Sequence, residues 1–412
     1  MKELILKHWN SSELPSGVRV ITFITSIRWF GWGFGETLIP VMIYSFGHSF
    51  AQAGLLSAGY EVGLILTLPI IGIAADRMKA TTLILIGLAI YLFVGSSYLL
   101  AGITGLAIFI IIARFLNGIA YSFDSIGRQT YFMRHTPASL VATAFGYLDT
   151  VADFWWIVAA LLGIILVQYV SIPVLLFFIT PFAAIGIVNV IRFRRKEKEV
   201  PITIERQSKG LLIKEFSNWN QPLKALTAFN FFITAAATVV AFFVPIEAHQ
   251  NGASLAAIVV MGVISTIPTL FGWDLGKLFD VKGSRVFTLG LLAFAVLMFS
   301  LVFLRSYIWQ VAIYFLVNVV VELLYVGNAE LVSLHANPEH LGKITGIMRS
   351  TGYIGGLTGP LAAGVIMDSY GVPSAYAAFG VILLILAVLF YFLRKHGYLK
   401  NPFVATDELL AK

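Results

Sequence analysis

Charged side chains occur inside long apolar stretches of this chain, where they are costly. Arg28 and Glu36 lie in one stretch, and Arg114, Asp124 and Arg128 lie in another. An ionisable group at bilayer depth costs about 2.5–3.5 kcal/mol on insertion scales, so such residues mark pathways for protons, ions or polar substrates. At a rise of about 1.5 Å per residue, Glu36 matches Arg114 in depth and Arg28 matches Asp124. The spacing predicts two cross-helix pairs, which would either take part in transport or fix helix packing.

Further carboxylates lie in later apolar stretches. Asp149 and Asp153 are four residues apart, so a helix would place both on one face. Two carboxylates this close in a low dielectric tend to share a proton, which suits proton coupling or a cationic group. Glu322 lies near the centre of another stretch, with Asn318 one turn before it. Deep acids outnumber deep arginines, which favours protons or cations over an anionic substrate. The acids are Glu36, Glu61, Asp149, Asp153 and Glu322, and the arginines are Arg28, Arg114 and Arg349.

Aromatic side chains are dense near these charges. They could stack on a lipophilic or cationic substrate, or face lipid and neighbouring helices. Other chemistries find no support, because the chain has no cysteine, no nucleotide-binding glycine-lysine-serine loop and only scattered histidines. We expect no metal, no cofactor and no enzymatic activity. The aromatic residues are Trp29, Phe30, Trp32, Phe34, Trp155 and Trp156.

The elements that must position these residues are membrane helices. The 412 residues are 58% hydrophobic and 12% charged, with a mean hydropathy of +0.88, whereas a soluble domain carries about 25% charged residues. Apolar runs of about 20 residues, the length that crosses a bilayer as a helix, recur throughout. We expect an all-α integral membrane protein with twelve transmembrane helices. The predicted spans are 18–44, 52–75, 80–101, 104–131, 140–168, 172–191, 223–247, 254–276, 284–304, 307–333, 342–367 and 372–394.

A basic segment that begins at Arg192 divides these stretches into two equal sets. The division predicts a six-helix bundle at 1–191, a linker at 192–222, a second six-helix bundle at 223–395 and a tail at 396–412. Within the linker, residues 211–219 have the pattern of a short amphipathic helix on the membrane surface. Two such halves are the plan of a transporter built from repeats.

Basic residues also predict the orientation. Nearly all Lys and Arg residues lie on the side of the predicted topology that holds both termini and the linker; the exceptions are Arg28, Arg114, Arg305 and Arg349. Because positive charge is retained in the cytoplasm, both termini and the linker are expected there, in the cell (inner or plasma) membrane. The same distribution accounts for the net charge of +7 without a nucleic-acid partner.

The two halves share a loop motif. Gly72-x-x-x-Asp76 ends the second span, and Gly276-x-x-x-Asp280 ends the eighth. The repeat indicates a six-helix unit duplicated in parallel. A glycine at such a position would let helices approach closely.

The first loop, Gly72-Ile-Ala-Ala-Asp76-Arg77-Met78-Lys79, resembles the signature loop of the major facilitator superfamily. The resemblance covers the whole chain and implies two pseudo-symmetric six-helix bundles that alternate around a central cavity. It also implies that Asp76 and Arg77 form a cytoplasmic latch, although Arg77 and Lys79 could merely enforce topology. The predicted gating residues are Asp76, Arg77, Asp124, Arg128 and Asp280.

A second resemblance concerns Arg114-Phe-Leu-Asn117-Gly118, which is similar to the arginine-x-x-glutamine-glycine motif of proton-coupled members, with asparagine in place of glutamine. Its arginine stays protonated and would stabilise the charged form of a nearby carboxylate, here Glu36. The glycine-proline motif typical of drug–proton antiporters is absent from the fifth span. A similar Gly359-Pro360 occurs in span eleven instead, which weakens the drug-antiporter interpretation.

Together these features predict a proton-coupled antiporter that exports a lipophilic or cationic compound as a monomer in the lipid bilayer. Glu36, Asp153 or Glu322 would carry the proton, and Arg114 would tune the carboxylate. The alternatives are a symporter that imports a sugar, amino acid or other metabolite, and a sensor or lipid-handling scaffold that transports nothing. The predicted substrate- and proton-binding residues are Arg28, Glu36, Arg114, Asn117, Asp149, Asp153, Asn318 and Glu322.

Overall fold

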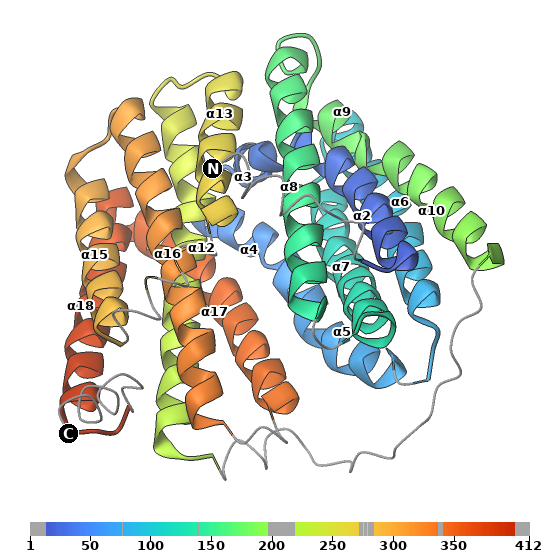
Figure 1. The fold of residues 1–412 in the computed structure, drawn as a ribbon. Coiled ribbons are helices and arrows are strands. Elements are labelled where there is room, and N and C mark those ends of the chain that lie inside the picture. The colour runs from blue at the N-terminus through green and yellow to red at the C-terminus, as the bar shows by residue number, and fades with distance from the viewer. Residues whose placement is uncertain are drawn as a thin grey trace, which may run out of the picture. The chain divides into compact units, whose positions relative to one another are not determined.

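The computed structural model describes residues 14–75, 77–137, 140–196, 219–271, 275, 278, 284–336 and 341–399, and these residues form helices and no strands (Figure 1). The helices are α2 (Ser16–Gly33), η2 (Glu36–Leu38), α3 (Ile39–Gly47), α4 (Phe50–Ser57), α5 (Gly59–Ala75), α6 (Ala80–Thr104), α7 (Ile108–His135), α8 (Val141–Leu166), α9 (Ile172–Phe177), α10 (Ile179–Lys196), α12 (Gln221–Gln250), α13 (Leu255–Thr266), η4 (Ile267–Phe271), α15 (Ser284–Phe303), α16 (Tyr307–His335), α17 (Leu341–Tyr370) and α18 (Val372–Lys395).

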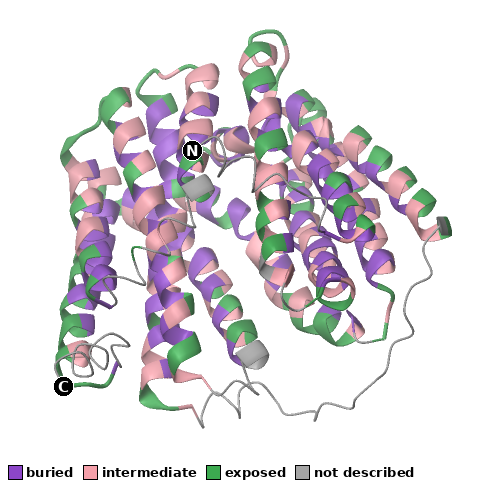
Figure 2. Cartoon of the chain, viewed as in Figure 1, coloured by how far each residue is buried: buried purple, intermediate pink, exposed green. Residues whose placement is uncertain are grey.

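Within those ranges, nine helices are long and apolar enough to cross a membrane. The remaining predicted spans correspond to the broken helix α2–η2–α3, to α13 with η4, and to the more polar α17. The twelve-helix prediction is therefore confirmed. Exposed positions run along the long helices (Figure 2), and on α5 they include Leu66, Ile70 and Ile73. Apolar side chains that are exposed on a membrane helix suit contact with lipid.

The helices group into two compact units. The first contains Met1–Gly47, Leu56–Arg206 and Ser254–Val263, and the second contains His48–Leu55, Gln207–Ala253 and Ile264–Lys412. Each unit takes one short segment from the opposite half of the sequence. The boundaries predicted at 191 and 223 stay predictions, and most of the proposed amphipathic helix, 211–218, lies outside the described residues.

In the first unit, the first membrane helix is broken in its middle. Helix α2 ends at Gly33, Gly35 adopts φ −147° and ψ 0°, and the short turn η2 starts at Glu36. Glycine is a poor helix former, so a glycine-rich run weakens the helix at this point. The backbone of α8 contacts the break directly, because a Cβ on Gly33 would lie 2.4 Å from the Trp156 carbonyl oxygen. Broken helices in transporters commonly mark binding sites.

Helices α5 and α7 of the first unit also meet through glycines. A Cβ on Gly118 would lie 2.1 Å from the Tyr60 carbonyl oxygen, and one on Gly63 would lie 2.5 Å from the Phe115 carbonyl oxygen. Only glycine permits backbones this close. At Gly72, no atom of the described chain lies within 4 Å of the position its Cβ would take. The close helix approach predicted for Gly72 stays a prediction.

In the second unit, the glycines of α17 pack closely against two neighbouring segments. Gly355 and Gly359 pack on the α12 backbone, at 2.3 and 2.4 Å for an added Cβ, while Gly364 packs on Phe50 of the His48–Leu55 segment. At the end of α17, the Asp368 carboxylate accepts hydrogen bonds from the backbone N–H groups of Phe50 (2.9 Å) and Ala51. These contacts cap the first turn of α4.

Candidate functional site in the first unit

A cavity of about 240 Å³ lies inside the first unit. Its lining combines two arginines and two carboxylates with aromatic rings, so it is polar at a few points and otherwise able to stack on a ligand. It is formed by α2, η2, α5, α6 and α7. The lining residues are Arg28, Trp29, Trp32, Glu36, Tyr60, Glu61, Tyr91, Arg114, Asn117 and Tyr121.

Glu36 reaches the cavity from the helix break. As the first residue of η2, it is half-buried. The indole Nε1–H of Trp156, on α8, donates a hydrogen bond of 2.7 Å to Glu36 Oε2. Among the described residues, no ion pair joins Glu36 to an arginine, although Arg28 and Arg114 interact with it electrostatically.

Arg114 is held by aromatic and backbone groups of α5 and its neighbours. Its guanidinium lies 4.9 Å from the centre of the Tyr60 ring, and its Nε donates to the Ser57 carbonyl oxygen over 3.4 Å. Gly118, one turn further along α7, brings the two backbones close enough for this contact. Electrostatic interaction links Arg114 to Glu61, which lines the same cavity. The predicted partner Glu36 is thus a neighbour of Arg114, not its ion-pair partner.

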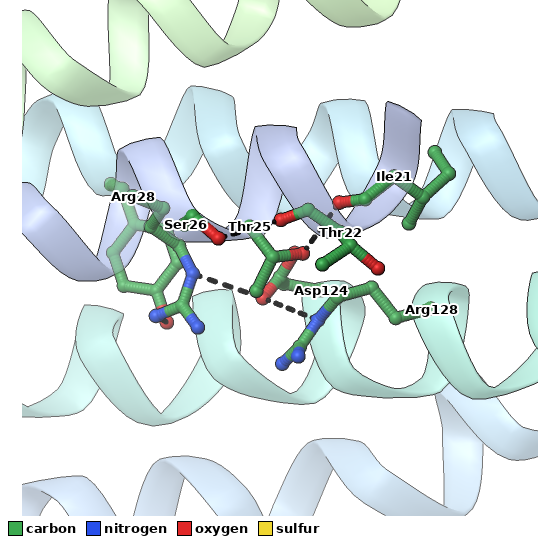
Figure 3. A network of polar contacts seen from close by, with 8 residues as sticks. Ile21, Thr22, Thr25, Ser26, Arg28, Asp124 and Arg128 are labelled. Atoms are coloured by element: carbon green, nitrogen blue, oxygen red, sulfur yellow. Dashed lines mark hydrogen bonds and ion pairs between the residues drawn. The ribbon is translucent and has the colours of Figure 1, made fainter. Parts of the chain in front are cut away.

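Arg28 is paired as its depth predicts. Its Nε lies 3.2 Å from Asp124 Oδ2, and Arg128 Nε lies 3.1 Å from the same oxygen (Figure 3). All three side chains are buried. Arg28 also lies 4.7 Å from the Trp29 ring centre and 5.3 Å from that of Tyr91. The network joins α2 to α7, and its Arg28 also lines the cavity.

The two arginines of the cavity therefore have close partners, whereas its two carboxylates form no ion pair among the described residues. Arg28 is neutralised by Asp124 and stacked on rings, and Arg114 is stacked on Tyr60. Glu36 and Glu61 take part in no ion pair within the described ranges. A carboxylate in such a place favours a proton or a cationic ligand as its partner.

Of the other predicted binding residues, one lines the cavity and four lie elsewhere. Asn117 is buried and lines the cavity, whereas Asp149 is exposed on α8 and Asp153 is half-buried there. Asn318 and Glu322 are half-buried on α16 of the second unit, where Asn318 Nδ2 donates to the Tyr314 carbonyl oxygen. None of these last four side chains belongs to the lining of the first-unit cavity.

The predicted gating residues are only partly described. Asp76 and Asp280 lie outside the described residues. Arg77 is exposed in the turn after α5, and the end of that helix is held by Arg134, whose Nη2 donates to the Ala75 carbonyl oxygen over 2.9 Å. Asp124 and Arg128 belong to the buried network with Arg28. No cluster of side chains suited to a metal occurs in the part of the chain that the structure describes.

Sequence reasoning missed the roles of three residues of this site. Tyr60 and Tyr91 hold the arginines, and Trp156 holds Glu36. A tyrosine in an apolar run is weak evidence for a binding site, because tyrosine rings also pack throughout helical cores. Trp156 was named only as a possible stacking group, and the helix break that turns Glu36 toward it was not foreseen.

A polar, aromatic-lined cavity inside a bundle of apolar helices is an arrangement typical of membrane transporters. The family model described as Major Facilitator Superfamily matches residues 21–360 and again residues 284–407. The chain therefore belongs to the Major Facilitator Superfamily. It is a multi-pass membrane transporter, not an enzyme.

Similar proteins include relatives and solved structures. Multidrug resistance protein MdtG of Salmonella paratyphi A (strain ATCC 9150 / SARB42) is 29% identical over 193 residues, which are 43% of this chain and 46% of the relative. The matched region thus spans under half the length of that relative. Two solved structures share the fold. Nucleoside transporter NupG is 15% identical, and the match covers 92% of this chain and 100% of NupG with a TM-score of 0.75. A bacterial homologue of the human lysosomal transporter Spinster, inward-facing and unoccupied, is 16% identical, and the match covers 92% of this chain and 96% of the homologue with a TM-score of 0.69.

Proposed function

We propose that the protein exports a lipophilic or cationic compound in exchange for protons. The observation that carries this proposal is the state of the cavity charges: both arginines are engaged, and the carboxylates of Glu36 and Glu61 are in no ion pair of the described chain. A cation that enters would meet two acceptors and a wall of aromatic rings. The likeness to a relative named as a multidrug resistance protein supports the same substrate class.

In this scheme, proton and substrate compete for the same carboxylates. When Glu36 and Glu61 are charged, the cavity attracts the cation, and when they take up protons, the cation leaves. Arg114 interacts electrostatically with both carboxylates. Aromatic side chains of the lining, among them Trp32 and Tyr121, would contact the apolar part of the substrate. The buried Arg28–Asp124–Arg128 network keeps α2 and α7 together while this exchange takes place.

Transport by purified protein in proteoliposomes tests the proposal, with tetraphenylphosphonium as the lipophilic cation. We expect an imposed pH gradient to drive its accumulation, and Glu36→Gln and Glu61→Gln each to reduce the gradient-driven rate at least tenfold. Asp153→Asn and Glu322→Gln, measured alongside, separate the first-unit cavity from the other predicted carriers. Glu330→Gln, near the end of α16 and outside the cavity, is the control and should transport normally.

Three results would count against the proposal. Transport that ignores the pH gradient would exclude proton coupling. Wild-type rates in both Glu36→Gln and Glu61→Gln would exclude this cavity as the exchange site. Proton-driven uptake of a neutral metabolite with no movement of the cation would replace export by symport.

A further inference from the structure

We infer that Trp156 is the positioning residue that holds Glu36 in its charged form and passes proton binding at Glu36 on to the broken first helix. The inference rests on the proposed function, in which Glu36 exchanges protons with the substrate. Its starting point is the 2.7 Å hydrogen bond from the Trp156 indole to Glu36 Oε2. An indole nitrogen can only donate, and bonds to an ionised acceptor are about twice as strong as neutral ones. Proton uptake by Glu36 therefore weakens this contact.

Trp156 is firmly placed to serve as a donor. Its side chain is buried, and its own carbonyl oxygen lies against Gly33 at the end of α2. Two turns further along α8, Gly163 packs on the backbone of Phe34, where an added Cβ would lie 2.5 Å from the carbonyl oxygen. Helix α8 thus packs closely against the end of α2 at Gly33 and Phe34, through the Trp156 carbonyl oxygen, the Ala159 side chain and Gly163. The indole cannot follow a displaced carboxylate unless α8 moves as well.

The other charged and titratable groups around Glu36 do not replace this bond. Arg28 on α2 and Arg114 on α7 interact with it electrostatically, as does Tyr98 on α6. Glu61 on α5 lines the same cavity. On α8 itself, Asp153 is half-buried one turn before Trp156. Within the described ranges, Trp156 is the side chain that donates a hydrogen bond to Glu36.

The turn that carries Glu36 has a second contact. Thr37 lies against Gly262 of α13, in the Ser254–Val263 segment that belongs to the first unit, and a Cβ on Gly262 would lie 2.1 Å from Thr37 Cγ2. Turn η2 is therefore held between α8 and α13. Turn η2 contacts both α8 and α13, so a weaker Trp156–Glu36 hydrogen bond changes how this turn is held between them. Proton binding at Glu36 would therefore affect the packing of both helices.

The first test is the pH profile of equilibrium tetraphenylphosphonium binding to the full chain in detergent. Trp156→Phe keeps an aromatic ring and removes the donor. We expect the midpoint of pH-dependent binding to move to higher pH by about one unit, a tenfold change in proton affinity. Trp155→Phe is the matched control, because Trp155 is the adjacent, exposed indole and contacts Phe30 and Phe154 instead. It should keep the wild-type midpoint.

A double variant separates positioning from a general structural effect. In a Glu36→Gln background, Trp156→Phe should change nothing further. An unchanged midpoint in Trp156→Phe, an equal shift in Trp155→Phe, or a shift that persists without Glu36 would overturn the inference. If neither Glu36→Gln nor Glu61→Gln alters the pH dependence of binding, the proposed function fails. If only Glu61→Gln alters it, the inference fails and the proposed function stands. If Glu36→Gln abolishes that dependence and Trp156→Phe leaves it intact, the positioning role alone fails.

A second measurement needs no tryptophan variant and covers the case in which Trp156→Phe does not fold. The chain has eight tryptophans, so ¹⁵N-tryptophan labelling gives eight indole N–H signals by NMR. We expect one signal to move across the pH range in which binding changes, and the same signal to be pH-independent in Glu36→Gln. If every indole signal stays constant with pH in the wild-type protein, the inference is wrong.

Discussion

A single carboxylate oxygen, Oδ2 of Asp124, neutralises two guanidinium groups in the first unit. Arg28 approaches it at 3.2 Å from α2, and Arg128 at 3.1 Å from its own helix α7. Two side-chain hydroxyls of α2 in the same region, those of Thr25 and Ser26, bond to carbonyl oxygens of their own helix. The carboxylate is therefore the partner that these buried cations share, and its removal would leave both uncompensated.

Asp124→Asn should destabilise the protein strongly. Breaking a buried ion pair by removing one partner costs about 3–5 kcal/mol, because the remaining charge stays buried. We expect a large fall in the thermal unfolding temperature of the purified protein in detergent. Asp149→Asn removes a carboxylate that is exposed and that interacts with Arg128 only electrostatically, so it should change the temperature little. Equal effects of the two substitutions would contradict the role given to Asp124.

Depth along the sequence predicted some of these contacts and not others. Arg28 and Asp124 were matched by depth, and the structure joins them. Glu36 and Arg114 were matched by the same rule, yet Arg114 lies over Tyr60 and Glu36 accepts from Trp156. Depth fixes the height of a residue and not the direction in which its helix faces. The helix break before Glu36 changes the direction in which this side chain points, and a rule based on depth along the helix cannot predict such a break.

At the scale of elements, glycine spacing decides which helices touch. Gly118→Ala should push α7 away from α5, because its Cβ would lie 2.1 Å from the Tyr60 carbonyl oxygen. Overpacking of this kind costs about 1–3 kcal/mol, and the shift moves Arg114 off the Tyr60 ring. We expect lower thermal stability and a loss of transport in proteoliposomes.

Gly72→Ala is the matched substitution, since open space surrounds Gly72 among the described residues. Alanine is the better helix former by up to about 1 kcal/mol. We expect unchanged or slightly higher thermal stability and normal transport. If both alanine variants behave alike, close contact at Gly118 does not control the site.

The start of α4 in the second unit depends on a charge from α17. The Asp368 carboxylate accepts hydrogen bonds from the backbone N–H groups of Phe50 and Ala51, and Asp368→Ala should leave both N–H groups without this acceptor. Loss of a helix cap costs about 0.5–2 kcal/mol, or about 2- to 30-fold in hydrogen exchange. Exchange followed by mass spectrometry should show faster labelling of this turn, while peptides from α7 in the same sample stay protected. Unchanged labelling at residues 50 and 51 would show that the cap does not stabilise the turn.

For the whole molecule, composition predicted more than motifs did. Low charge and recurring runs of about 20 apolar residues are sufficient for the twelve-helix fold, because the bilayer leaves helices few alternatives. The assignment of His48–Leu55 to the second unit and of Ser254–Val263 to the first was not predictable. It depends on close contacts at single glycines, such as Gly364 against the Phe50 backbone and Gly262 against the Thr37 side chain, which apolar periodicity does not encode.

Orientation is the whole-molecule property for which the sequence makes the sharpest prediction. Nearly all basic residues lie on the side of both predicted termini and the linker, so that side should face the cytoplasm. The chain contains no cysteine, so single cysteines can be added without first removing any. Ser208→Cys probes the linker, and Ser254→Cys probes the turn between α12 and α13 on the opposite side.

In intact cells, a membrane-impermeant maleimide should label Ser254→Cys and leave Ser208→Cys unlabelled until the membrane is permeabilised. The linker carries a dense run of Lys and Arg, and moving it across the bilayer would expose each charge to a cost of several kcal/mol at the membrane centre. The turn before α13 carries no such charge. The reverse labelling pattern would invert the topology and would contradict the orientation predicted from the basic residues. The proton gradient, and not the orientation of the chain, sets the direction of exchange, so the two variants test the topology alone.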